Sequence, residues 1–412
     1  MLRDPRLGPI RLCWRRHLST TYSFAAGGGA RGRVALLKAP SHLGHYTSRV
    51  NRPTNEDRYA AALMEVPRGS SLTPRSRREA GKQKVFNFSV FDGHGGNECS
   101  QFLADNLAKY VEEFDLATVY DIAKDYRKNV GGYWRHWRDS EVEHYVSRLN
   151  SQDDLQLRVP MAFLKADYDF TVRDKRPAGS TCTSVYIYSH EPDTVFWEPN
   201  QVSSLLVAHV GDTRAILSDS HGSAHRLTAI HHPSSPTETE RLSRYASSFF
   251  TDSFGEERFG RFANTRAFGD AIGKSRGITA EPQLLECLIG KDANRIAATS
   301  PNNHHSIKTF GGDEGFVVIV SDGVSDMVSD QEIVDLVMAT AYKSGSMRGT
   351  PQDAAKEVVE FAQALGGDDN ATCLVIRLPG WGKWTWTDKT GILREDRLRD
   401  ALDSQNRRDR RA

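Results

Sequence analysis

Two strand-like segments of the chain run directly into Asp-Gly turns, and this limits what the chain can fold into. Residues 85–91 alternate and are rich in aromatic and β-branched side chains, and they end at Asp92 and Gly93. Residues 316–320 are wholly apolar and are followed by Ser321, Asp322 and a glycine. Such runs are predicted to be β-strands, and a glycine lets another group approach the backbone closely. We therefore expect both aspartates at strand ends, facing a ligand.

Other segments predict a mixture of strands and helices. Further strand-like runs lie at residues 183–189, 205–210, 214–218 and 372–378. Ser329 and Glu332 form a capping box before an apolar run, and Thr350 with Pro351 begins a helix that ends near Gly366. Strands and helices are not regularly interleaved, which favours an α+β architecture over a doubly wound sheet.

Composition excludes several classes of protein. The chain has 412 residues and a net charge of +1, which gives no electrostatic case for a nucleic-acid or membrane partner. No apolar run approaches the roughly 20 residues that a transmembrane helix needs. The five cysteines are scattered, so we expect reduced, buried thiols in a reducing compartment rather than disulfides or a zinc site.

The first residues differ from the rest in being rich in arginine and poor in acids. Residues 1–33 contain seven arginines and one acid, Asp4. This composition is typical of a mitochondrial transit peptide, and residues 16–19 (Arg-His-Leu-Ser) resemble a processing site. The alternatives are a basic tail without an address or a nuclear signal. We expect residues 1–45 to be a transit peptide and a flexible junction, with glycines at 27–29.

The remainder reads as one domain with additions. We expect this domain at residues 46–380, with a charged and aromatic helical insertion near residues 115–150. Residues 381–412 form a charged extension that contains Trp381, Trp384 and Trp386. These tryptophans are expected to pack against the domain.

Acidic residues occur at four places where a strand is predicted to begin or end. Besides Asp92 and Asp322, the pairs are Glu56-Asp57, shortly after Arg52, and Asp368-Asp369 before the last strand. Each pair by itself is an ordinary turn or a solvated surface. The ordered set instead indicates hard oxygen ligands for Mg²⁺ or Mn²⁺, which phosphate ester hydrolysis commonly uses in pairs.

These segments resemble the motif series of the metal-dependent protein serine/threonine phosphatase family, protein phosphatase 2C, in particular its mitochondrial members of fungal type. Intermediate markers agree in order at residues 179–181 (Gly-Ser-Thr), 210–214 (Val-Gly-Asp-Thr-Arg) and 264–270 (Asn-Thr-Arg-Ala-Phe-Gly-Asp). The resemblance covers roughly residues 46–380. It implies an α+β fold: a central β-sandwich of two antiparallel sheets flanked by α-helices, with a dinuclear metal cleft at one end.

The resemblance also implies a set of ligands for two ions of Mg²⁺ or Mn²⁺. Asp92 resembles the carboxylate that bridges both ions, and Glu56 with the Gly93 carbonyl resembles the other protein ligands of one. Asp322 and Asp369 resemble those of the second ion. A third, weaker ion is implied at Asp212 and Asp322, with Asp326 nearby.

Three further residues resemble the family's catalytic groups. Arg52 looks like the arginine that binds the substrate phosphate, for which a planar fork is suited. His94 resembles the general acid that protonates the leaving serine or threonine oxygen; the alternative is a turn histidine with a structural hydrogen bond. Asp57 resembles the acceptor that orients metal-bound water. A water that bridges the metals would attack phosphorus in line, without a covalent phosphoenzyme.

The match is imperfect at two positions. The family usually has an aspartate where Ile230 precedes His231, and a tryptophan where this chain has Ser325. Neither position resembles a primary metal ligand. The two departures therefore put the third-metal site and the substrate preference in question rather than, in the first place, the catalytic activity. His231 and His232 are adjacent in the sequence. Because adjacent side chains point apart on most backbones, the two are not expected to form a metal site. Residues 243–257 occupy the position of the family's flap beside the cleft.

The function implied is dephosphorylation of phosphoserine and phosphothreonine in mitochondrial phosphoproteins, with matrix enzymes as plausible substrates. Two alternatives stay open. One is a pseudophosphatase, a regulatory binding module on the same fold, and the other is a phosphatase of small molecules.

Overall fold

The computed structural model describes residues 19–25, 31–67, 81–148, 154–174, 176–191, 194–198, 200–253, 255–294, 308–342, 348–385 and 387–409. The predictions for residues 1–18, for the glycines at 27–29, and for Cys13 and Trp386 lie outside these residues. Within them, no helix combines the length and the apolar character that crossing a bilayer requires.

The larger of two main sheets contains seven strands. Its order is β14-β13-β7-β6-β5-β4, with β12 paired to β6, and only β13 and β14 pair in parallel. The strands are β4 (Arg58–Pro67), β5 (Lys82–His94), β6 (Gly179–Ser189), β7 (Ser203–Val210), β12 (Phe268–Gly269), β13 (Gln283–Ile289) and β14 (Lys308–Thr309).

The smaller sheet has five antiparallel strands in the order β3-β16-β15-β8-β9. They are β3 (Leu43–Ser48), β8 (Arg214–Ser218), β9 (Ala224–Arg226), β15 (Phe316–Val320) and β16 (Ala371–Arg377). The predicted strand runs therefore all fall on observed strands, and β5 carries its run through Asp92 as expected.

The two sheets pack face to face through alternating side chains. Phe86, Phe88 and Val90 of β5 lie in one buried cluster with Val317 and Ile319 of β15. Because successive side chains of a strand point to opposite faces, the intervening residues of each sheet are left to bury against helices. This double burial explains why the central strands are apolar along most of their length.

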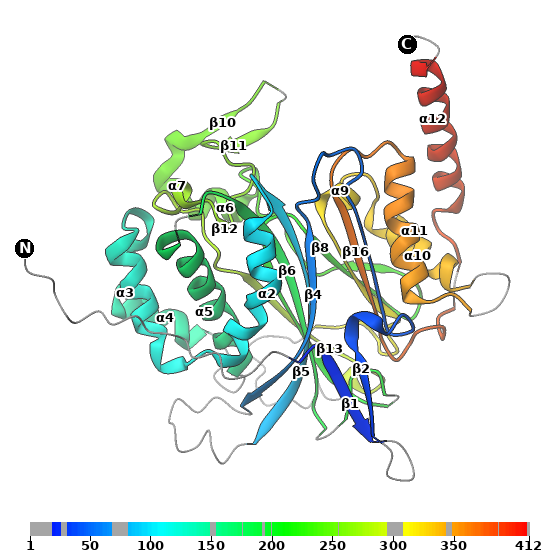
Figure 1. The fold of residues 1–412 in the computed structure, drawn as a ribbon, viewed down its shortest axis with the longest axis horizontal. Helices are drawn as coiled ribbons and strands as arrows, with labels where there is room; N and C mark the ends of the chain where they lie inside the picture. Colours follow the sequence, from blue (N-terminus) through cyan, green and yellow to red (C-terminus); the bar gives the residue numbers. More distant parts are fainter. Residues whose placement is uncertain are drawn as a thin grey trace, which may run out of the picture.

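Helices cover the outer faces of both sheets (Figure 1). The larger sheet is covered by α2 (Glu98–Glu113), α3 (Val119–Asn129), α4 (Asp139–Arg148) and α5 (Asp154–Tyr168). The smaller sheet is covered by α10 (Asp330–Ala341) and α11 (Pro351–Ala364). The predicted α+β sandwich flanked by helices is confirmed.

The remaining elements are short, apart from α12. They are α6 (Pro236–Arg241), α7 (Ala271–Lys274), α9 (Asp322–Ser325), α12 (Gly391–Asp409), the hairpins β1 (Thr21–Ala25) with β2 (Arg31–Ala35) and β10 (Phe249–Thr251) with β11 (Glu257–Phe259), 3-10 turns at Leu36–Lys38, Leu116–Thr118, Gly132–His136 and Ser243–Ser248, and a π-helical turn at Asp169–Arg173.

The fold begins earlier than residue 46. The β1–β2 hairpin packs on the sandwich, with the Tyr22 ring 5.3 Å from that of Trp197 and 5.8 Å from that of Phe86. The Leu63 N–H donates to the Ser19 carbonyl at 2.8 Å. The predicted flexible junction is therefore wrong for residues 19–25 and 31–45. The hairpin is held by side chains distant in the sequence, which a local pattern does not reveal.

The helix signals and the C-terminal tryptophans behave as predicted. Ser329 caps α10 in a capping box, and Thr350 caps α11, where Asp353 completes a second box. Trp381 and Trp384 pack on Phe316, with ring centroids 5.7 and 5.8 Å away. Four cysteines, Cys99, Cys182, Cys287 and Cys373, are buried free thiols.

Candidate metal centre

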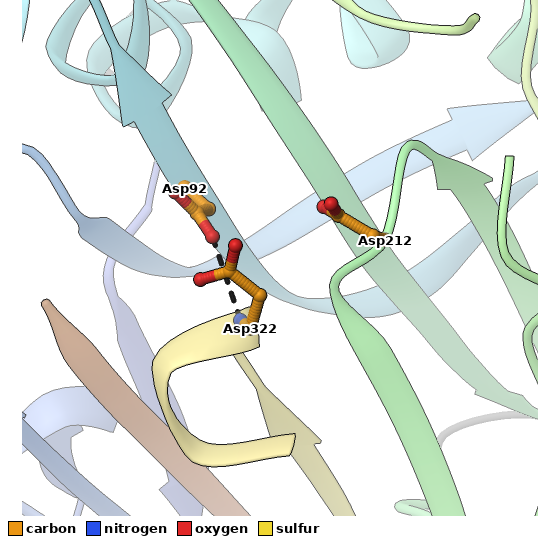
Figure 2. A group of neighbouring side chains, drawn as sticks. All are labelled: Asp92, Asp212 and Asp322. Atoms are coloured by element: carbon orange, nitrogen blue, oxygen red, sulfur yellow. Dashed lines mark hydrogen bonds between the residues drawn. The ribbon is translucent and has the colours of Figure 1, made fainter. Parts of the chain in front are cut away.

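Three carboxylates meet where the two sheets adjoin. Figure 2 shows Asp92 near the end of β5, Asp322 at the start of α9, and Asp212 in a loop facing them. One carboxylate oxygen from each lies within 4.8 Å of the others. The Asp322 N–H also points to the Asp92 carboxylate, at 3.5 Å.

The topology of the sheets explains this convergence. Asp92 belongs to the larger sheet, and Asp322 follows β15 of the smaller one. Asp212 lies between β7 and β8, where the chain passes from one sheet to the other. Residues 110 or more positions apart are thereby brought to one end of the sandwich. Gly93 stands next to them, and a Cβ there would lie 2.5 Å from the Glu56 carbonyl oxygen, so glycine is required.

Glu56 and Asp369 line the same cleft, and Asn370 links the segments that carry them. The Asn370 side chain accepts a hydrogen bond from the Glu56 N–H at 2.7 Å and donates one to the Thr54 carbonyl at 3.0 Å. Arg52 forms an ion pair with Asp369 at 2.7 Å, and 53% of its side chain stays exposed. The guanidinium is therefore accessible to a ligand in the cleft.

Asp57 lies behind the cleft lining and is almost fully buried. Its Oδ2 accepts hydrogen bonds from the hydroxyls of Ser321 at 2.8 Å and Thr372 at 2.7 Å. Because Ser321 immediately precedes Asp322, these bonds tie Asp57 to the segment that carries a candidate ligand. Burial raises the pKa of Asp57 to about 6, although the two hydroxyls favour its charged form.

The clustered carboxylates disfavour one another's ionisation. Burial, followed by the charges of neighbouring carboxylates, raises the pKa of Asp92 well above its usual range. Burial also raises the pKa of Asp322 well above its usual range, and Asp212 is the charged neighbour that contributes most to this rise. Without a counter-charge, such a group of half-buried, ionised acids is electrostatically unfavourable.

The donor set fits a hard divalent cation. Within the described part of the chain, Oδ1 of Asp57 and Oδ1 of Asp212 are buried and have no hydrogen-bond partner, although buried polar atoms normally have one. The three clustered donors are all carboxylates. Oxygen-only sites are the type that Mg²⁺ and Mn²⁺ prefer over zinc.

His94, at the end of β5, pairs with Asp270. The His94 Nε2 lies 2.9 Å from the Asp270 Oδ2, and Asp270 adopts a left-handed conformation, with φ 52°. A side chain at position 179 would collide with both groups, so Gly179 is needed there. Burial opposes protonation of His94, but the hydrogen bond and charge of Asp270 outweigh it, and the His94 pKa is raised.

Asp326 and His231 are placed beside the cluster rather than in it. Asp326 lines a neighbouring hollow with Arg214 and Arg226, and burial followed by the Asp212 charge raises its pKa. The buried His231 ring stacks on His209, with centroids 4.7 Å apart. Its Nδ1 accepts the Gly211 N–H at 3.0 Å, so His231 supports the turn that carries Asp212.

The cleft encloses about 540 Å³. Its lining residues are Arg52, Pro53, Thr54, Glu56, Asp92, Gly93, His94, Gly95, Thr181, Asp212, Arg258, Arg261, Phe262, Ala263, Asn264, Asp270, Asp322, Asp369 and Asn370. All the predicted site residues except Asp57 and Asp326 are thus brought to one cavity.

Sequence reasoning missed the residues that orient the candidate ligands. Asn264 donates to the Asp212 Oδ2 at 2.7 Å, Asp270 holds His94, and Asn370 holds the Glu56 backbone. The motif at residues 264–270 marked two of them without indicating a role. Their partners are distant in the sequence, so only the fold could supply the pairing.

Comparison with known proteins identifies related chains. The family model described as Protein phosphatase 2C matches residues 56–371. Protein phosphatase 2C homolog 4 of Schizosaccharomyces pombe is 37% identical over 379 residues, which cover 90% of this chain and 89% of that protein. A Xenopus laevis protein named Protein phosphatase 1K, mitochondrial, is 26% identical over 344 residues, or 83% of this chain and 69% of that protein.

A solved structure supports the fold. The crystal structure of a serine-threonine phosphatase 2C from Toxoplasma gondii matches with a TM-score of 0.50 and 17% identity, covering 82% of this chain and 94% of the other. At this identity the likeness concerns the fold alone.

Proposed function

The chain belongs to the protein phosphatase 2C family, and we propose that it is an active protein serine/threonine phosphatase that uses two divalent cations. The observation that carries this proposal is the convergence of Asp92, Asp212 and Asp322 at the junction of the sheets. Half-buried acids held this close to one another repel when ionised, and a bound cation would offset that repulsion. An inactive binding module would have no need to keep them.

We assign the ion ligands from the cleft lining. Asp92 would contact both ions, with Glu56 and the Gly93 carbonyl completing one site and Asp322 with Asp369 the other. Mg²⁺ or Mn²⁺ bound there would lower the pKa of water to give a nucleophile and would offset the charge of the phosphate. A third, weaker ion is proposed at Asp212 and Asp322, with Asp326 nearby.

The protein side chains would bind the substrate and move the proton. The exposed Arg52 guanidinium would bind the phosphate oxygens through paired N–H donors. His94 would donate a proton from Nδ1 to the leaving serine or threonine oxygen, because Asp270 holds Nε2 and favours the protonated ring. Asp57, with one oxygen fixed by two hydroxyls, would present its other oxygen to an ordered water.

The decisive experiment replaces Asp92 by asparagine, which preserves side-chain shape and removes charge. With Mn²⁺ and a phosphothreonine peptide, Asp92→Asn should lower turnover by about a thousandfold or more, with an unchanged circular dichroism spectrum. Asp105→Asn, at an exposed position on α2, is the matched control and should retain activity.

Full activity in Asp92→Asn would refute the metal assignment. A folded wild-type protein that binds Mn²⁺ but releases no phosphate from peptides would instead establish the regulatory binding module. Hydrolysis of small phosphate esters without any hydrolysis of phosphopeptides would point to the small-molecule phosphatase.

We further propose that the protein acts in mitochondria, on phosphoproteins such as matrix enzymes. Support comes from the arginine-rich residues 1–18 and from the Xenopus laevis relative named as mitochondrial. The predicted processing motif at residues 16–19 begins at the second of the adjacent arginines Arg15 and Arg16.

A reporter fusion tests this placement. Residues 1–18 and residues 1–45 should each direct a fluorescent protein to mitochondria, since the signal is assigned to the arginine-rich part. Replacing the arginines of residues 1–18 by glutamine should leave the reporter in the cytosol. Diffuse fluorescence from both unmodified fusions would refute the assignment.

A further inference from the structure

A hairpin beside the cleft brings basic side chains to the substrate's side of the candidate metal centre. We call residues 243–253 and 255–262 the flap; it contains β10 and β11, which project from the sandwich in Figure 1. Its last residues reach the cleft, where Arg258, Arg261 and Phe262 belong to the lining. Arg52 belongs to the lining as well, from another part of the chain.

The three arginines differ in how their charge is compensated. Arg258 pairs with Asp252 at 3.0 Å and Glu256 at 2.6 Å, and Arg52 pairs with Asp369. Arg261 has no carboxylate partner within the described residues. Its side chain is exposed, and its guanidinium lies 5.7 Å from the centroid of the Phe262 ring. Arg261 therefore contributes an uncompensated positive charge to the cleft.

The flap holds this charge in a defined place. Phe259 and Leu242 are buried in a small cluster that also contains Ile278, and Phe262 packs against it. Phe259 and Phe262 exchange backbone hydrogen bonds at 3.0 and 3.1 Å around the turn that carries Arg261. A side chain on a fixed turn loses less conformational freedom when it binds a ligand than one on a loose loop.

Resting on the proposed phosphatase function, we propose that Arg261 binds an anionic side chain that flanks the phosphorylated residue, so that the cleft selects acidic or doubly phosphorylated peptides. A guanidinium is suited to this role because it can bind a carboxylate or a phosphate through two parallel N–H donors. The phosphate to be hydrolysed occupies the carboxylate end of the cleft. A peptide chain that leaves this end along the flap passes Arg261.

The test compares phosphothreonine peptides of equal length whose flanking residues are acidic, neutral or basic, with a fourth peptide that carries a second phosphate. Wild type should show a kcat/KM for the acidic peptide about fivefold above the neutral one, the size of a partly exposed charge pair. The acidic and doubly phosphorylated peptides separate carboxylate from phosphate recognition. The preference should shrink at high salt.

Arg261→Ala should abolish this preference, and Arg261→Glu should reverse it in favour of the basic peptide. Arg244→Ala removes the same charge from an exposed flap position outside the cleft lining and should keep the wild-type preference. The proposal is overturned if the ratio of kcat/KM for the acidic peptide to that for the neutral peptide is the same in wild type and Arg261→Ala. It is also overturned if Arg244→Ala loses the preference for the acidic peptide to the same extent as Arg261→Ala.

Failure of the underlying function is recognised separately. Wild type that hydrolyses neither the peptides nor p-nitrophenyl phosphate with Mn²⁺ refutes the phosphatase assignment. In that case, the peptide preference is measured as the affinity for the same peptides, labelled with a fluorophore, by fluorescence anisotropy. Tighter binding of the acidic peptide that Arg261→Ala removes supports the role of Arg261, and equal binding by both proteins overturns it.

Discussion

Among single residues, the clustered carboxylates of the candidate metal centre are where the requirements of folding and of the proposed function conflict. Asp92, Asp212 and Asp322 lie close together, and burial raises the pKa of each. Folding without a cation must therefore either leave some of them protonated or accept their repulsion. A bound cation removes this penalty, so folding and metal binding are thermodynamically linked.

At Asp57 this conflict should be measurable as a dependence of stability on pH. Its pKa is about 6 in the folded protein and close to the ordinary 3.8 in the unfolded chain. The folded state therefore keeps the proton to a higher pH, and with a chelator present the free energy of unfolding should fall as pH rises above about 4. Asp57 contributes about 3 kcal/mol to this fall, of which about 1 kcal/mol lies between about pH 5 and about pH 8.

Urea denaturation with EDTA across that range checks the prediction. Asp57→Asn should show a shallower decline than wild type, because it removes the titrating group. Asp105→Asn, at its exposed position, should follow the wild-type curve. Parallel curves for wild type and Asp57→Asn would show that Asp57 does not titrate as the structure indicates.

The pairing of His94 with Asp270 predicts a shift in the pH dependence of catalysis. Asparagine tolerates the left-handed conformation of residue 270, so Asp270→Asn should keep the backbone while lowering the His94 pKa. The alkaline limb of the kcat profile for phosphopeptides should move to lower pH. At neutral pH, kcat should fall by roughly tenfold to a hundredfold.

An aryl phosphate serves as the control substrate, because its leaving group departs without help from an acid. The profile for that substrate should respond much less to Asp270→Asn. If the alkaline limb for phosphopeptides stays where it is in wild type, His94 is not the proton donor.

At the scale of secondary structure, the helices near residues 115–150 support the turn that carries Asp270. The Tyr126 hydroxyl, on α3, donates to the Asp167 Oδ2 at 2.6 Å. The Asp167 Oδ1 accepts the Gly269 N–H at 2.8 Å and pairs with the buried Lys274 of α7 at 2.9 Å. The segment predicted as a helical insertion contains α3 and α4, and its Tyr126 holds Asp167, which contacts residues on both sides of Asp270.

Tyr126→Phe tests this support at the level of one hydrogen bond. Loss of the bond to a buried carboxylate should lower the free energy of unfolding by about 1–3 kcal/mol. It should also lower kcat more than it changes KM, because the His94–Asp270 pair loosens while the phosphate site is untouched. Urea denaturation and steady-state kinetics on a phosphopeptide measure the two effects.

Tyr120→Phe is the matched control on the same helix, where the side chain is 44% exposed. It should leave both the stability and kcat unchanged. A normal kcat for Tyr126→Phe, measured where that protein is fully folded, would show that the helical insertion near residues 115–150 does not affect catalysis.

At the scale of the whole molecule, the candidate metal centre lies across the interface of the two sheets. Asp92 comes from the larger sheet, Asp322 follows a strand of the smaller sheet, and Asp212 lies in the connection between them. Ions bound there would join the two halves of the sandwich. Metal binding should therefore act on global stability and not only on the cleft.

Added Mn²⁺ should raise the melting temperature by several degrees, as stabilisation reaches about 2.7 kcal/mol at a hundredfold excess over Kd. Differential scanning calorimetry over a series of Mn²⁺ concentrations measures the shift. Asp322→Asn should melt at nearly the same temperature with and without Mn²⁺. An equal upward shift in wild type and Asp322→Asn would place Mn²⁺ elsewhere.

Prediction from the sequence succeeded where a residue's environment is local. Asp92 and Asp322 each follow an apolar strand, so their position at a strand end could be read directly. The capping box at Ser329 and the N-cap at Thr350 are short-range hydrogen bonds and were equally readable. Prediction failed for the N-terminal hairpin, because Tyr22 is held by Trp197 and Phe86, which lie far along the chain.

The sequence by itself determined which segments form strands, where helices begin, and which acids stand at strand ends, because these depend on neighbours within a few residues. Only the tertiary structure decided which distant groups meet. The pairing of His94 with Asp270, the support of Asp270 by Tyr126 through Asp167, and the exposure of Arg261 to the cleft each depend on contacts that close long loops of chain. Such contacts follow from the packing of sheets and helices, which no single segment encodes.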